Sequence, residues 1–154
     1  MEGSNLLLQQ NRELSPWLKT DQQIEQWLKQ RQAVLITYHQ LCQTKISTSN
    51  FKLSTLNTFC QYLMDYLSAG HFKIYETLAE AYQTSEGPNQ GINDKLLEKI
   101  LLTTDIALDF NDKYTEPKNL QELPEDLSTL GENLAHRMEW EDKLVNTYLK
   151  ITKH

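Results

Sequence analysis

Residues 52–82 read KLSTLNTFCQYLMDYLSAGHFKIYETLAEAY, and this stretch predicts one long helix. It contains no proline, and its apolar residues recur every three to four positions, as they do on one face of a helix. The predicted core stripe comprises Leu56, Phe59, Cys60, Leu63, Leu67, Ile74 and Leu78. A helix with a single apolar face needs neighbouring helices to cover that face, so the stretch predicts a helical assembly.

Further helices are predicted on both sides of this stretch. A short helix covers about residues 5–14, and longer ones cover about residues 21–43, 93–114 and 124–152. Their stripes are Ile24, Leu28, Leu35, Tyr38 and Cys42; Leu96, Leu97, Ile100, Leu101, Ile106 and Leu108; and Leu127, Leu130, Leu134, Leu144, Val145 and Tyr148. The segment Ser85–Gly91, which contains a Gly-Pro pair, is the clearest break between them.

The expected fold class is therefore all-α, and the expected architecture is an antiparallel bundle of four long helices plus a short N-terminal helix. The 154 residues suffice for one hydrophobic core. We expect one domain over residues 1–154, with residues 1–4 poorly ordered.

The charge balance favours a protein partner over nucleic acid or a membrane. The chain has 15 Lys and Arg against 21 Asp and Glu, a net charge of −6. An acidic surface repels nucleic acid and anionic lipids and attracts basic proteins. No signal peptide or membrane-length apolar stretch is evident, so a cytoplasmic location is expected. Cys42 and Cys60 lie on predicted apolar faces and are interpreted as reduced core thiols.

Several charged residues lie inside or beside the apolar stripes. Arg31 falls between Leu28 and Leu35, and both Arg137 and Glu141 fall between Leu134 and Leu144. His71 flanks the stripe of the long helix. Because unpaired buried charges are costly, these groups are expected to pair with one another as a buried polar network. The alternative is a ligand or catalytic pocket in the bundle core.

The sequence offers no motif for catalysis or for binding a cofactor. It has no Gly-rich phosphate loop, no arrangement of Ser, His and Asp, and no zinc-ligand spacing. The Glu-x-x-His spacing of di-iron bundles is absent as well. We therefore predict no catalytic, cofactor-binding or metal-binding residues, and the chain is interpreted as a protein without enzymatic activity.

The long helix has a second face that points away from its apolar stripe. At about 100° per residue, Phe72 projects roughly 165° from the core direction. Asp65 and Ser68 lie near it, and Gln61, Tyr75 and Glu76 follow the same side. An apolar anchor beside acidic residues is typical of a protein-binding face. The alternatives are that this helix is central and packs on both sides, or that Phe72 merely covers a loop.

The run Asp65-Tyr-Leu-Ser-Ala-Gly-His-Phe72, within Phe59–Glu76, resembles the regulator of sigma D family, Rsd or AlgQ. Supporting matches are Trp27-Leu28 with Arg31, and Leu130-Gly-Glu followed by Arg137 and by Glu141-Asp-Lys-Leu144. The resemblance extends from about Gln23 to Leu149 and is weak over the first 20 residues and over about Thr84–Leu123.

This resemblance implies an α-helical bundle that binds the C-terminal, DNA-reading domain of the primary sigma factor. It implies a one-to-one complex that blocks the promoter and core-polymerase contacts of that domain, a role in stationary phase, and a monomeric free form. The contacts carry over to Asp65, Ser68 and Phe72, with Glu76 and Trp27 as further candidates. Two rival functions remain open, a ligand sensor or enzyme using the polar core, and an adaptor for another basic protein.

Overall fold

The computed structural model describes residues 17–43, 49–84, 90–116 and 120–152. These residues form helices and connecting turns without any strand, which confirms the all-α fold class. The predicted short helix over residues 5–14 and the expected disorder of residues 1–4 lie outside this part of the chain. None of the described helices is both long and apolar enough to cross a membrane.

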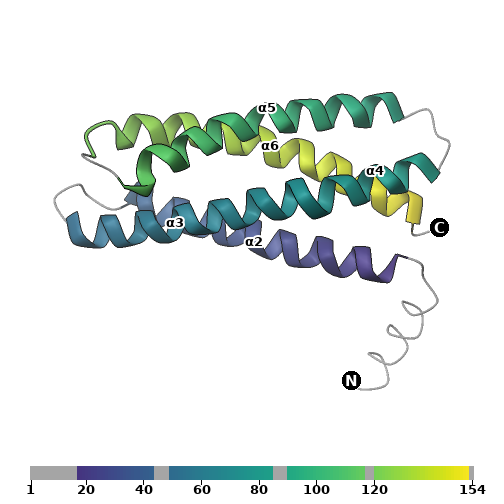
Figure 1. Ribbon diagram of the computed structural model, residues 1–154, viewed down its shortest axis with the longest axis horizontal. Coiled ribbons are helices and arrows are strands. Elements are labelled where there is room, and N and C mark those ends of the chain that lie inside the picture. Colours follow the sequence, from purple (N-terminus) through teal and green to yellow (C-terminus); the bar gives the residue numbers. More distant parts are fainter. Residues whose placement is uncertain (1–16, 44–48, 85–89, 117–119, 153–154) are drawn as a thin grey trace, which may run out of the picture.

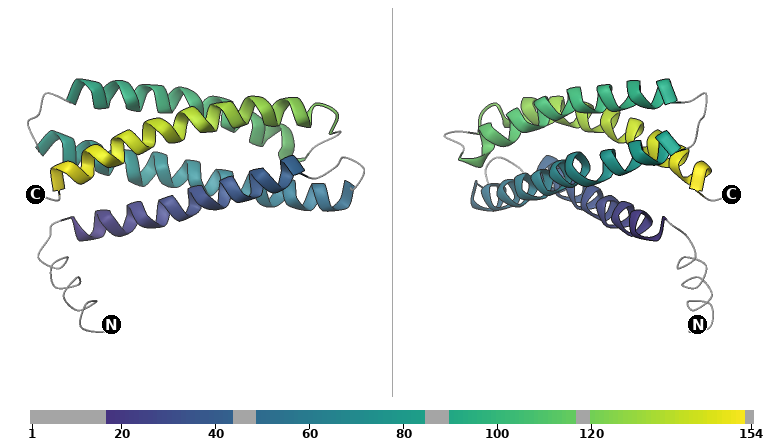
Figure 2. Two further views of the ribbon diagram at one scale, coloured as in Figure 1. Left: turned by 180° about the vertical axis from the view of Figure 1, so that it is seen from behind. Right: turned by 45° about the vertical axis from the view of Figure 1, so that its right-hand side comes forward.

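The described residues form α2 (Leu18–Gln43), α3 (Ser49–Ala69), η1 (Gly70–Ile74), α4 (Tyr75–Thr84), α5 (Gln90–Thr115) and α6 (Leu123–Thr152). Figure 1 shows α3 and α4 as one continuous rod, joined through η1, beside α2, α5 and α6. Consecutive rods run in opposite directions, and Figure 2 shows from behind that α2 crosses the bundle at an angle. The predicted long helices differ from these elements by three residues or fewer at each end.

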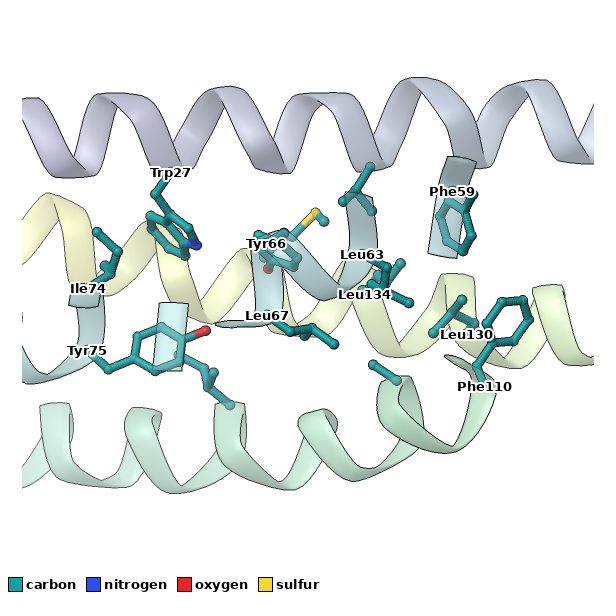
Figure 3. Close-up of a cluster of buried hydrophobic side chains, with 14 of the residues drawn as sticks. Trp27, Phe59, Leu63, Tyr66, Leu67, Ile74, Tyr75, Phe110, Leu130 and Leu134 are labelled. Carbon is teal, nitrogen blue, oxygen red and sulfur yellow. The ribbon is translucent and has the colours of Figure 1, made fainter. Parts of the chain in front are cut away.

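One cluster of buried apolar side chains fills the space between the rods, and every described helix contributes to it. Figure 3 shows its centre, where Phe59, Leu63 and Leu67 of the long rod meet Leu130 and Leu134 of α6. All the apolar residues predicted for the core faces of the long rod and of α6 are buried, so both of these stripes are confirmed.

The predicted core faces of α2 and α5 were partly wrong. Leu35 is 46% exposed and the Cys42 side chain is also exposed, whereas Trp27, Val34 and Leu41 are buried. In α5, the predicted core residues Leu101 and Ile106 are exposed, while Ala107, Phe110 and Tyr114 are buried. Both helices carry two adjacent apolar rows, and the buried row recurs every seven residues, the spacing that keeps one seam facing neighbouring helices.

The segment η1 is a π-helical turn inside the long rod. The Tyr75 backbone N–H donates to the Gly70 carbonyl, five residues earlier, instead of to the usual partner four residues earlier. The extra residue rotates the following positions by about 100° relative to a regular helix. Tyr75, expected on the outer face, is therefore buried.

Gly70 leaves room for the aromatic rings beneath this turn. A Cβ atom there would lie 3.0 Å from the Tyr75 hydroxyl and 3.3 Å from Trp27 Nε1. Neither ring has space to retreat, because both are buried and the Tyr75 hydroxyl is hydrogen-bonded to Glu141.

We therefore expect Gly70→Ala to lower the free energy of unfolding by about 1–3 kcal/mol, through overpacking. At an open helical site the same change would stabilise the protein by about 1 kcal/mol. Urea denaturation of the two proteins measures the difference. A stabilised Gly70→Ala variant would show that the rings can move aside.

Candidate functional site

The residues predicted to contact a partner lie along the outer side of the long rod. Asp65 and Ser68 are on the last two turns of α3, Phe72 is in η1, and Glu76 is on the first turn of α4. Asp65 and Glu76 are exposed and Ser68 is half-buried. The structure thus places the predicted contact residues, except Trp27, on the surface.

Phe72 is the apolar feature of this face. Its side chain is 72% exposed, the largest exposed fraction among the large apolar side chains that the structure describes as exposed. The edge of the His71 ring packs against it, with ring centroids 4.8 Å apart. A phenylalanine left in water beside carboxylates is the kind of side chain that a protein partner covers.

The prediction that Trp27 contacts a partner was wrong for this structure, because the side chain is only 1% exposed. Its indole stacks on Tyr66, with ring centroids 6.0 Å apart, and meets Tyr75 edge-on at 6.1 Å. Figure 3 shows it pointing from α2 into the bundle. The indole N–H has no hydrogen-bond partner among the described residues, so ring packing holds this side chain in place.

A buried polar network occupies the middle of the bundle, centred on the Glu141 carboxylate of α6. Tyr66 donates to it at 2.6 Å and Tyr75 at 2.8 Å. Nε of Arg137 lies 3.3 Å from the same carboxylate, and both charged side chains are fully buried. Three elements, α3, α4 and α6, thereby meet at one carboxylate.

Every nitrogen of the Arg137 guanidinium has a partner in this network. Nε donates to the Tyr66 hydroxyl at 3.1 Å, and one terminal nitrogen donates to the Tyr75 hydroxyl at 2.6 Å. The other terminal nitrogen donates to the hydroxyls of Thr103 and Thr104 on α5. Each tyrosine hydroxyl thus accepts from Arg137 and donates to Glu141, which satisfies both charges.

Arg31 closes the network at its edge. Its guanidinium lies 3.4 Å from Glu141 and 2.7 Å from the exposed Asp142, and it is itself mostly buried. His71 does not take part, because its side chain is exposed on η1 and packs on Phe72. The prediction that His71 joins the network was wrong, because its position at the edge of the core stripe is exposed in the structure.

Burial dominates the ionisation of the groups in this network. It raises the pKa of the Glu141 carboxyl, while Arg137, the two tyrosine hydroxyls and Arg31 oppose the rise. It also raises the pKa of the Tyr66 and Tyr75 hydroxyls, and the neighbouring Glu141 charge adds to that effect. Both hydroxyls therefore stay protonated as donors over the whole neutral range.

The network has four further members that were not predicted from the sequence, Tyr66, Tyr75, Thr103 and Thr104. A signal was present for Thr103, because a threonine on the buried row of α5 needs a polar partner. Among the described residues, no group of three or more His, Cys, Asp or Glu side chains could hold a metal ion. The arrangement satisfies its own charges and fixes the helices that carry them.

The comparisons with known proteins identify one family. The family model described as "Regulator of RNA polymerase sigma(70) subunit, Rsd/AlgQ" matches residues 6–149. A curated "Regulator of sigma D" from Yersinia pseudotuberculosis serotype O:1b (strain IP 31758) is 30% identical over 129 residues, which cover 79% of this chain and 76% of that protein. One from Pectobacterium carotovorum subsp. carotovorum (strain PC1) is also 30% identical over 129 residues, covering 79% and 84%.

The central ion pair yields a test by substitution. Arg137→Met and Glu141→Leu should each lower the free energy of unfolding by about 3–5 kcal/mol. The first leaves the buried Glu141 with only Arg31 as a counter-charge among the described residues, and the second leaves the buried Arg137 with none. The double variant should lose much less free energy of unfolding than the sum of the two single losses. The double variant still leaves the hydroxyls of Tyr66 and Tyr75 without their hydrogen-bond partners. Adding Tyr66→Phe and Tyr75→Phe should therefore recover further stability. Urea denaturation measures all four proteins, and strictly additive losses would contradict this account.

The buried tyrosines yield a test by pH. An unfolded chain ionises its tyrosines near pH 10, whereas the folded hydroxyls of Tyr66 and Tyr75 keep their protons. The unfolded state then binds fewer protons, so stability should fall as pH rises above about 10. In Tyr66→Phe/Tyr75→Phe this fall should be shallower, as measured by urea denaturation across the alkaline range. An unchanged slope would show that these hydroxyls ionise normally.

Proposed function

The chain belongs to the family of regulators of the RNA polymerase sigma-70 subunit, Rsd/AlgQ, and from this membership we propose that it binds the C-terminal, DNA-reading domain of the housekeeping sigma factor. Binding would block the contacts of that domain with the promoter and with core polymerase. The sigma factor would then be sequestered, leaving core polymerase to alternative sigma factors. The chain acts here by binding and not by catalysis.

The exposure of Phe72 between two carboxylates is the observation that carries this proposal. A phenylalanine that is 72% exposed adds little to the stability of the free bundle, and its burial against a partner yields hydrophobic free energy. Asp65 and Glu76 are both exposed on the same rod, before and after Phe72, and would supply negative charge at its rim. Arginine and lysine side chains of a basic partner fit such a rim.

Electrostatics favours a DNA-binding domain as that partner. A domain that reads DNA presents a basic surface, and this chain has a net charge of −6. The acidic face would compete with DNA phosphates for the same cations, which speeds encounter and selects against acidic proteins. We propose a one-to-one complex in the cytoplasm with a free form that is monomeric, and a single domain over residues 1–154.

Titration of the chain with the purified C-terminal sigma domain of the same organism tests the proposal. We expect saturable one-to-one binding that weakens as salt is raised, because charge pairs contribute. Asp65→Lys should weaken binding further by like-charge repulsion. Absence of binding at tens of micromolar, with both proteins folded, would refute the proposal, and binding of another basic protein instead would favour an adaptor.

Substitution of the apolar anchor gives a sharper result. Phe72→Ala should weaken binding of the sigma domain by about 1–3 kcal/mol, without changing the melting temperature. Leu102→Ala is a matched control, because Leu102 on α5 is 71% exposed and lies outside the proposed face. Isothermal titration and thermal denaturation of both variants are required. A large drop in melting temperature for Phe72→Ala would show that Phe72 belongs to the core.

A further inference from the structure

An open groove of about 390 Å³ lies between α3 and α5, beside Asp65. From α3 its lining includes Asn57, Gln61, Met64 and Asp65, and from α5 it includes Asn111 and Thr115. Figure 1 shows the two helices running side by side in opposite directions. The residues of α5 that line this groove fall in the region where the family resemblance in the sequence is weak.

The groove is continuous with the proposed binding face. Asp65 belongs to both, and Ser68 and Phe72 follow it at three- and seven-residue spacing along the same rod. Residues three and seven positions apart lie on one side of a helix, so a partner that covers Phe72 and Asp65 also reaches the mouth of the groove. A side chain of that partner is therefore within reach of the groove.

The chemistry of the lining points to a cation with many hydrogen-bond donors. The groove offers the Asp65 carboxylate, the amide oxygens of Asn57 and Asn111 and the hydroxyl of Thr115, and none of its lining residues is Lys, Arg or His. A guanidinium carries five N–H donors in a planar fork and matches several acceptors at once. The Met64 thioether provides apolar surface for the methylene stem of such a side chain.

We infer that this groove receives an arginine side chain of the sigma domain, and that Asn111 and Thr115 of α5 therefore belong to the binding surface. The inference rests on the proposed function. In a second copy of this chain, Arg31 and Arg137 are engaged in the buried network, so neither supplies the arginine. The remaining arginine, Arg12, lies outside the described residues. Small anions are disfavoured because they would face Asp65 without a cation.

Asn111→Lys tests the groove directly. The new ammonium would pair with Asp65 and occupy the position of the incoming guanidinium, so binding of the sigma domain should weaken about tenfold or more. Asn146→Lys is the matched control, because it is the same substitution at an exposed position of α6, which does not line the groove. It should change the dissociation constant by about twofold or less. Circular dichroism and melting temperature verify that both variants fold.

The arginine itself is identified by double-mutant cycles. Each arginine of the sigma domain is replaced by Met and titrated against the wild-type chain and against Asn111→Ala. Replacement of one of these arginines should weaken binding to the wild-type chain. The same replacement should weaken binding to Asn111→Ala much less, because the contact is already lost in that variant. Absence of coupling for every arginine would overturn the inference.

The two proposals fail in different ways. If Asp65→Lys and Phe72→Ala weaken binding while Asn111→Lys behaves like Asn146→Lys, the groove carries no partner side chain and the sigma-binding function stands. If the wild-type chain does not bind the sigma domain at all, both are refuted.

Discussion

The buried ion pair between Arg137 and Glu141 is the interaction on which the arrangement of the bundle depends. Removing two charges from water is costly, and the cost is met only when each charge has close partners. Those partners come from different rods: Tyr66 and Tyr75 from the long rod, Thr103 from α5, and Arg31 from α2. A slide or rotation of any one rod would leave a buried charge unsatisfied. The network therefore fixes the helix register that apolar packing alone leaves loosely defined.

Much of the fold was predictable because its signals are periodic and local. Apolar residues at three-to-four spacing defined four long helices, and their ends were predicted within three residues. Arg31, Arg137 and Glu141 were recognisable as network members because charges inside an apolar stripe demand an explanation. The tyrosines were not, since neither Tyr66 nor Tyr75 belonged to the predicted core stripe and Tyr75 was expected on the outer face.

The errors arose where tertiary contacts choose between local alternatives. In α2 both the Leu28–Leu35 row and the Trp27–Val34 row are apolar, and packing against the long rod buries the second. Tyr75 was misplaced because the π turn changes the phase of the long rod beyond it, and no propensity marks a π turn in a single sequence. The outer positions Asp65, Ser68 and Phe72 were predictable because they lie before or within that turn.

The π turn also bears on how this molecule can change through evolution. An α-helix that gains one residue must either rotate everything beyond it or absorb the residue in a local bulge. Between Gly70 and Ile74 the rod has such a bulge, with Phe72 on its outer side. Loss of one residue here would restore an ordinary helix with the core intact on both sides, whereas the same loss within Asp65–Ala69 would turn half of the rod away from its neighbours. Insertions and deletions at this turn can thus remodel the outer face while the bundle is inherited unchanged.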